Sequence, residues 1–61
     1  MRNYRFYFCD ESGRVVRRTE ADCVDEADAE MHAQSLLVSA PQSVRAVEIW
    51  TPKKLVQRVT R

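Results

Sequence analysis

The chain has 61 residues, of which 44% are hydrophobic and 31% are charged, and its formal net charge is +1. This length leaves room for one domain, residues 1–61, with one hydrophobic core. The apolar content, with one glycine and two prolines, excludes a disordered or low-complexity chain. No apolar stretch approaches the roughly 18 residues of a membrane span and no cleavage site follows the first residues, so we expect a cytoplasmic protein without a membrane segment.

The charges are segregated along the chain. Residues 1–18 sum to +3, residues 19–41 to −6 and residues 42–61 to +4. An acidic middle therefore separates two basic ends. This balance argues against a protein that binds nucleic acid mainly through its net charge.

The first predicted element is a strand from Asn3 to Cys9, in which alternate aromatic residues occupy one face: Tyr4, Phe6 and Phe8. Gly13 permits a three-residue hairpin loop, and a second strand follows from Val15 to Thr19. An uninterrupted register places Val15 and Arg17 on the face opposite the aromatic residues. The pairs in this register are Asp10 with Arg14, Phe8 with Val16 and Phe6 with Arg18.

The pattern then changes to that of a helix from Glu26 to Ser39. Asp25 is the expected N-cap, and Asp28 stands three residues later in a capping-box-like position. One apolar stripe follows the helix, made of Ala29, Ala33, Leu36, Leu37 and Ala40. Pro41 ends the helix, because proline disfavours the helical conformation of the residue before it.

Two further strands are predicted, from Ser43 to Trp50 and from Leu55 to Thr60, joined by a turn that contains Pro52. If Thr51 opposes Leu55, two favourable cross-strand pairs form, Glu48 with Arg58 and Val47 with Val59. A register shifted by one residue stays open at this point.

These elements predict an α+β fold of two layers, β-β-α-β-β. The helix returns the chain across the sheet, so the third strand can pair antiparallel with the first, which favours the strand order 2-1-3-4. The helix then covers Phe6, Phe8, Val47 and Ile49, the most apolar part of one sheet face. The other sheet face stays open to solvent.

No catalytic or cofactor motif accompanies this fold, and we expect neither an enzyme nor a bound cofactor. His32 is the only histidine, and no base is placed to activate Cys9 or Cys23. Asp25, Asp28 and His32 share one helical face, but acidic residues in a first helical turn are explained by the helix dipole, so no metal is expected. The two cysteines fall near opposite ends of the first hairpin, too far apart for a disulfide.

The open sheet face carries the candidate binding residues. In the expected registers it presents Arg5, Tyr7, Val15, Arg17, Glu48, Trp50, Val56 and Arg58. Tyr, Trp and Arg dominate binding hot spots, so the candidate site consists of Arg5, Tyr7, Arg17, Trp50 and Arg58. Its occupant is a second copy of the chain in a homodimer, a different protein, or single-stranded nucleic acid stacked on the aromatic rings. The balanced charge and the acidic helix argue against nucleic acid.

The acidic helix start supports a different hypothesis. Asp25, Glu26 and Asp28 could imitate phosphate, as expected of a small phage or bacterial inhibitor of a nucleic-acid-processing complex, of the anti-CRISPR kind.

The order of these motifs is similar to that of a known group. The aromatic strand Tyr4 to Phe8, the turn Asp10 to Arg14, the acidic helix start and the segment Ala46 to Trp50 form a pattern that spans nearly the whole chain. It resembles short uncharacterised proteins of alphaproteobacteria that open with an aromatic strand and an Asp-x-x-Gly-Arg turn. The resemblance implies a β-β-α-β-β fold and a bacterial origin, and it carries no activity. Pro52 and Lys53 stand where that group has a more polar or glycine-bearing turn.

Overall fold

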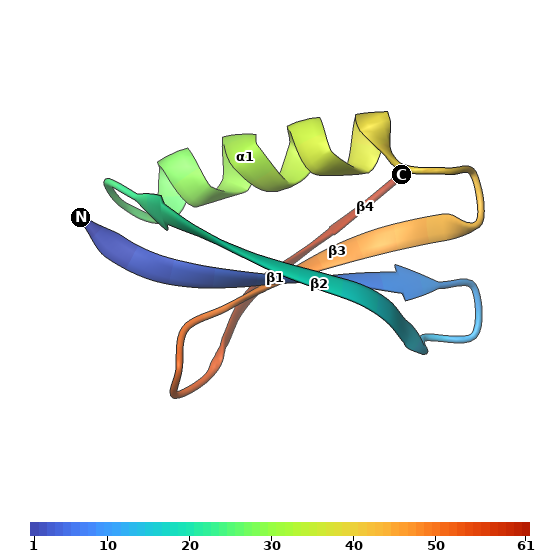
Figure 1. Cartoon of the computed structure of the whole chain (residues 1–61), viewed down its shortest axis with the longest axis horizontal. Coiled ribbons are helices and arrows are strands. Elements are labelled where there is room, and N and C mark those ends of the chain that lie inside the picture. The colour runs from blue at the N-terminus through green and yellow to red at the C-terminus, as the bar shows by residue number, and fades with distance from the viewer.

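The structure is a computed structural model that describes all 61 residues. Its elements in chain order are β1 (Arg2–Asp10), β2 (Val15–Cys23), α1 (Glu26–Ser39), β3 (Val44–Trp50) and β4 (Leu55–Thr60). The four strands form one antiparallel sheet in the order β2-β1-β3-β4, with α1 along one face (Figure 1). The predicted α+β architecture and strand order are confirmed. The single helix is too short and too polar to cross a membrane.

The helix has the predicted bounds, and its start is fixed by two carboxylates. The Asp28 N–H donates to Oδ1 of Asp25 at 2.9 Å, and the Val24 N–H donates to Oδ2 of Asp28 at 2.9 Å. Both bonds satisfy backbone donors at the helix entrance that have no partner within the helix. At the other end the Ala40 N–H donates to the Leu37 carbonyl at 3.2 Å, and Pro41 follows.

The core lies between α1 and the inner half of the sheet. The helix contributes Ala29, Ala33 and Leu37, and the sheet contributes chiefly Tyr4, Phe6, Phe8, Val47 and Ile49, all of them buried. Small side chains on α1 let it approach the strands closely. The helix packs mainly over β3 and β4 and contacts β1 and β2 less.

Asp10 organises the turn between β1 and β2. Its Oδ1 accepts hydrogen bonds from the Ser12 hydroxyl at 2.7 Å, from the Ser12 N–H at 3.0 Å and from the Arg14 N–H at 2.9 Å. The Ser12 hydroxyl bond and then the backbone bonds lower the pKa of this carboxyl. Gly13 has φ 87°, a left-handed conformation that only glycine adopts without strain.

The first hairpin departs from the expected register because β2 contains a bulge. Cys9 pairs with Val15, but Phe8 pairs with Arg17 and Phe6 with Thr19, and β2 continues four residues beyond the predicted end, to Cys23. Val16 is the extra residue. The predicted pairs Phe8 with Val16 and Phe6 with Arg18 are therefore wrong, and every β2 side chain beyond the bulge lies on the face opposite to the predicted one.

The second hairpin confirms its two predicted pairs. Glu48 lies across from Arg58 and Val47 from Val59. The expected opposition of Thr51 and Leu55 is wrong, because the Thr51 N–H donates to the Lys54 carbonyl at 2.9 Å and Trp50 pairs with Leu55. The one-residue shift is again absorbed by a bulge, here at Val56.

Candidate binding surface on the open sheet face

The sheet face away from α1 presents a compact group of aromatic and charged side chains. Antiparallel partners share a face, so the pairs Arg5 with Trp50, Tyr7 with Glu48, and Glu48 with Arg58 place these five residues together. They come from β1, β3 and β4, at the centre of the face. We call this group the Tyr7–Trp50 patch: Arg5, Tyr7, Glu48, Trp50 and Arg58.

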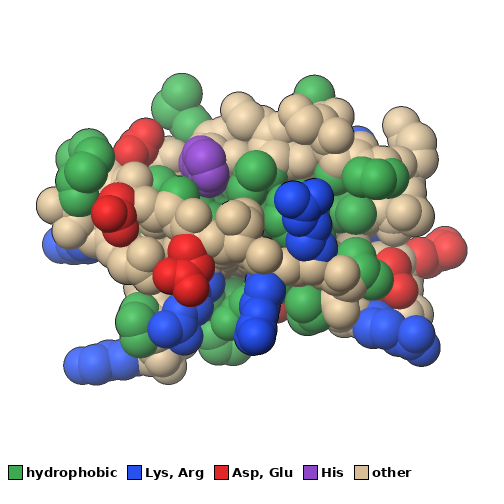
Figure 2. Space-filling view, in the orientation of Figure 1, with side chains coloured by type: hydrophobic (Ala, Val, Ile, Leu, Met, Phe, Trp, Pro, Cys, Tyr) green, Lys and Arg blue, Asp and Glu red, His purple; other side chains and the backbone are tan.

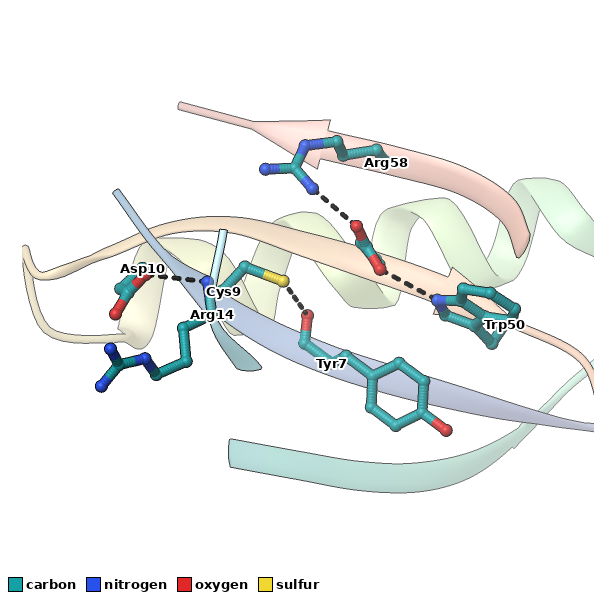
Figure 3. A network of polar contacts seen from close by, with 7 residues as sticks. Tyr7, Cys9, Asp10, Arg14, Trp50 and Arg58 are labelled. Atoms are coloured by element: carbon teal, nitrogen blue, oxygen red, sulfur yellow. Dashed lines mark hydrogen bonds and ion pairs between the residues drawn. The ribbon is translucent and has the colours of Figure 1, made fainter. Parts of the chain in front are cut away.

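The carboxylate of Glu48 orders the patch. Figure 3 shows Trp50 and Arg58 each joined by a dashed line to the carboxylate between them. The Trp50 indole Nε1–H donates to Oε1 at 3.0 Å, and the Arg58 guanidinium donates to Oε2 at 2.6 Å. The Tyr7 and Trp50 rings meet with their centroids 6.0 Å apart and their planes tilted by 57°. Such a tilted pair is a favourable aromatic arrangement, and it holds both rings in place before any partner binds.

Arg5 forms the other side of the patch. It lies across from Trp50 on β3 and from Glu20 on β2, and its buried Nε has no hydrogen-bond partner. A shallow polar depression beside it is lined by Arg5, Tyr7, Arg18, Thr19 and Glu20. Guanidinium groups at such a place suit a carboxylate supplied from outside.

Cys9 lies beside the patch, on the same face of β1 as Tyr7, and is buried. Its thiol is 1% exposed, and its Sγ–H donates to the Tyr7 carbonyl at 3.8 Å. Burial, and then the nearby Glu48 carboxylate, raise the pKa of the thiol. Burial followed by neighbouring aspartates raises the pKa of Cys23 as well. A reactive cysteine needs a lowered pKa and access to solvent, whereas these two thiols have a raised pKa and are buried.

The structure separates Arg17 from the other predicted site residues. Beyond the bulge Arg17 shares the face of Phe8, and its guanidinium carbon lies 5.8 Å from the Phe8 ring centroid on the helix side of the sheet. Its assignment to the open face was wrong. Arg18 occupies the open face instead, across from Tyr7.

The bulge in β4 likewise changes which residues of that strand lie on the open face. Val56 was expected on the open face but packs against the hydrophobic core, and Leu55, paired with Trp50, lies on the open face with 43% exposure. Leu55 adds apolar surface beside the patch. Sequence reasoning missed Arg18, Glu20 and Leu55, because bulges in strands exposed to solvent leave no trace in the hydrophobic pattern.

The acidic helix start has a structural explanation. Asp25 and Asp28 accept the two hydrogen bonds of the helix cap, and Glu26 is exposed in the first turn. Figure 2 shows acidic side chains gathered at the end of the molecule where α1 begins. That these groups imitate phosphate stays a prediction.

His32 and the other titratable side chains do not converge on a site. The His32 ring lies 4.9 Å from the Phe6 ring, centroid to centroid, at the edge of the core. The structure brings together no three His, Cys, Asp or Glu side chains in a way that could hold a metal ion. Cys9 and Cys23 are both free, and they belong to opposite ends of the β1–β2 hairpin.

Comparisons of the chain with models of protein families, with curated proteins and with solved structures give no significant match. The interpretation of this surface therefore rests on its own geometry.

Proposed function

We propose that the chain is a non-catalytic binding module that receives another protein on the Tyr7–Trp50 patch. The observation that supports this most is the ordered contact of Tyr7 and Trp50, with the indole N–H already held by Glu48. Large aromatic side chains supply most of the energy at protein interfaces, and a fixed rotamer reduces the entropy that binding costs.

The surroundings of the two rings suit a protein surface. Leu55 extends the apolar area, while Arg5 and Arg58 border it with positive charge. An aromatic and aliphatic centre with a charged rim is the usual anatomy of a protein interface. We therefore expect a partner that places apolar side chains on the rings and an acidic side chain near Arg5.

The same surroundings disfavour nucleic acid. Glu48 lies directly across from Tyr7 and two residues before Trp50, and Glu20 borders the same face. Carboxylates at these positions repel the phosphates of a strand stacked on the rings, whereas single-strand binders line the rings with positive charge.

The experiment compares capture by three baits from an extract of the source organism: the unchanged chain, Trp50→Ala and Met31→Ala. Met31 is 69% exposed on α1, and its truncation is the matched control on the opposite surface. The captured protein is then purified and its dissociation constant is measured with each bait. We expect Trp50→Ala to weaken binding by roughly 30-fold, about 2 kcal/mol, and Met31→Ala to leave it within about twofold.

The outcomes separate the possible occupants. A partner held equally by Trp50→Ala contradicts the proposal. Captured RNA or DNA, with an affinity that falls steeply with salt, replaces the protein by nucleic acid. Self-association that is lost in Trp50→Ala identifies the occupant of the patch as a second copy.

A further inference from the structure

The outer edge of the sheet at β2 is open along its length. β2 is an end strand of the sheet, and among its nine residues only Cys23 is buried. In Figure 1 this strand runs nearest to the viewer with no other element in front of it. The unpaired N–H and C=O groups of such an edge are a template for one more strand.

Charged side chains commonly protect an exposed edge, and β2 carries several. Arg18, Glu20 and Asp22 lie on its open-face side, across from Tyr7, Arg5 and Asn3. Asp22 accepts a hydrogen bond from the Asn3 side chain at 3.3 Å. The only ion pair of the chain joins Glu48 and Arg58, so Arg18 and Glu20 have no ion-pair partner of their own.

These charges favour one register, in which two copies of β2 oppose unlike charges and no like charges. Directly opposed residues of two antiparallel strands lie on the same face of the sheet. The two-fold axis between two copies of β2 must therefore lie level with one residue of the strand and not between two residues. An axis at Arg18 opposes two arginines, and an axis at Ala21 opposes Glu20 and Asp22. An axis at Glu20 pairs Arg18 with Asp22 twice but places the two Glu20 side chains directly opposite each other. An axis at Thr19 places Arg18 of each copy opposite Glu20 of the other copy, which gives two pairs of opposite charge.

We propose that β2 pairs antiparallel with β2 of a second copy about a two-fold axis at Thr19. The opposed residues are then Thr19 with Thr19, Arg18 with Glu20 and Arg17 with Ala21. Opposite charges and threonine pairs both favour neighbouring strands. The bulge at Val16 ends this regular segment on one side, which limits the alternative registers available to the strand.

The pairing joins two sheets into one of eight strands. A two-fold axis perpendicular to the sheet keeps both helices on one side and both Tyr7–Trp50 patches on the other. The patches stay exposed, so this dimer differs from self-association through the patch. The inference uses the edge of β2 and does not depend on the proposed function.

The test is the molecular mass in solution, measured by sedimentation equilibrium over a wide concentration range, for the unchanged chain, Glu20→Arg, Arg18→Glu and the double exchange. The chain mass is 7.1 kDa, and we expect the unchanged chain to reach twice this value. Each single reversal opposes like charges twice and raises the dimer dissociation constant by at least about tenfold. The double exchange restores the opposite pairs and the dimer.

Cross-linking provides an independent measurement if a charge variant folds poorly. Directly opposed Cα atoms lie about 4.5–5.5 Å apart, within the range of a disulfide, so Thr19→Cys should form a covalent dimer under mild oxidation. Glu20→Cys is the control, because Glu20 faces Arg18 of the other copy and should cross-link more slowly. Cys9 and Cys23 are 1% and 3% exposed, so the unchanged chain should not cross-link.

Each outcome decides the proposal. A monomer at all concentrations overturns it, as does a dimer that both single reversals leave intact or that the double exchange fails to restore. A dimer abolished by Trp50→Ala and retained by Glu20→Arg shows association through the patch and also overturns it. Loss of partner binding in Trp50→Ala with an unchanged dimer mass leaves this inference standing.

Discussion

Replacing Glu48 tests whether one carboxylate orders the Tyr7–Trp50 patch. Oε1 accepts from Trp50 at 3.0 Å and Oε2 accepts from Arg58 at 2.6 Å. Glu48→Gln keeps an acceptor for the indole but removes the charge that pairs with Arg58. Glu48→Ala removes both contacts and leaves the half-buried indole N–H without its protein partner.

The magnitudes follow from the exposure of the groups. The side chains of Arg58 and Glu48 are 42% and 20% exposed, so solvent screens the ion pair and its contribution is about 0.2–1 kcal/mol. The indole hydrogen bond adds about 1 kcal/mol. We therefore expect Glu48→Gln to lower the free energy of unfolding by less than about 1 kcal/mol, and Glu48→Ala by about 1–2 kcal/mol. For a domain of this size each kcal/mol corresponds to roughly 4–8 °C in Tm.

The assay is urea unfolding followed by the fluorescence of Trp50, the only tryptophan. A double-mutant cycle with Arg58→Gln isolates the ion pair, whose coupling energy should be below about 1 kcal/mol. Native-state fluorescence should change more in Glu48→Ala than in Glu48→Gln. Equal losses of stability in the two Glu48 variants, or no loss in either, would refute the role assigned to the indole hydrogen bond.

Three further predictions concern the first hairpin and the thiols. Arg17→Ala should lower stability by about 0.5–1 kcal/mol through the lost contact with Phe8, whereas Arg18→Ala should change it little in the monomer; equal effects in urea unfolding would contradict the bulged register. The hydrogen bonds that lower the Asp10 pKa contribute stability above the ordinary Asp pKa of about 3.9, and this contribution is lost as pH falls through the lower folded-state pKa. Asp10→Asn should therefore make the midpoint of urea unfolding depend less on pH in the acid range. Burial is the first cause of the raised pKa of both thiols, and the resulting pH dependence of stability has the opposite sign. Their contribution to stability is complete below about pH 8.5 and is lost at higher pH. Ellman's reagent should label Cys9 and Cys23 only as the protein unfolds.

Residues with one buried face made most of the fold predictable. Tyr4, Phe6 and Phe8 alternate along β1, and the structure buries all three. The helix was predictable from Asp25 at its start and Pro41 after its end, because capping and proline geometry are local properties of the sequence. The strand order followed from the need to bury the two most apolar strands at the centre.

The bulges could not be predicted, because few buried side chains constrain the strand segments that contain them. Val15, Val16, Arg17 and Arg18 are all exposed, so a register with or without an extra residue buries a similar apolar area. A shift of one residue exchanges the faces of all following side chains. This is why Arg17 was assigned to the open face although Tyr7 and Trp50, on the central strands, were placed correctly.

The pairing of two β2 strands also fixes the distance between binding patches, which leads to a prediction about avidity. Neighbouring strands lie about 4.8 Å apart, so the two copies of Tyr7 on β1 lie about 14 Å apart across the sheet and the two copies of Trp50 on β3 about 24 Å apart. A surface that displays the partner densely can engage both patches, and the effective concentration of the second contact raises the apparent affinity by about 10² or more. We expect oxidised Thr19→Cys to bind such a surface more tightly than its reduced form, at concentrations where the reduced form is monomeric, and both forms to bind a sparse surface alike. Equal binding of the two forms to the dense surface would show that the paired patches cannot act together.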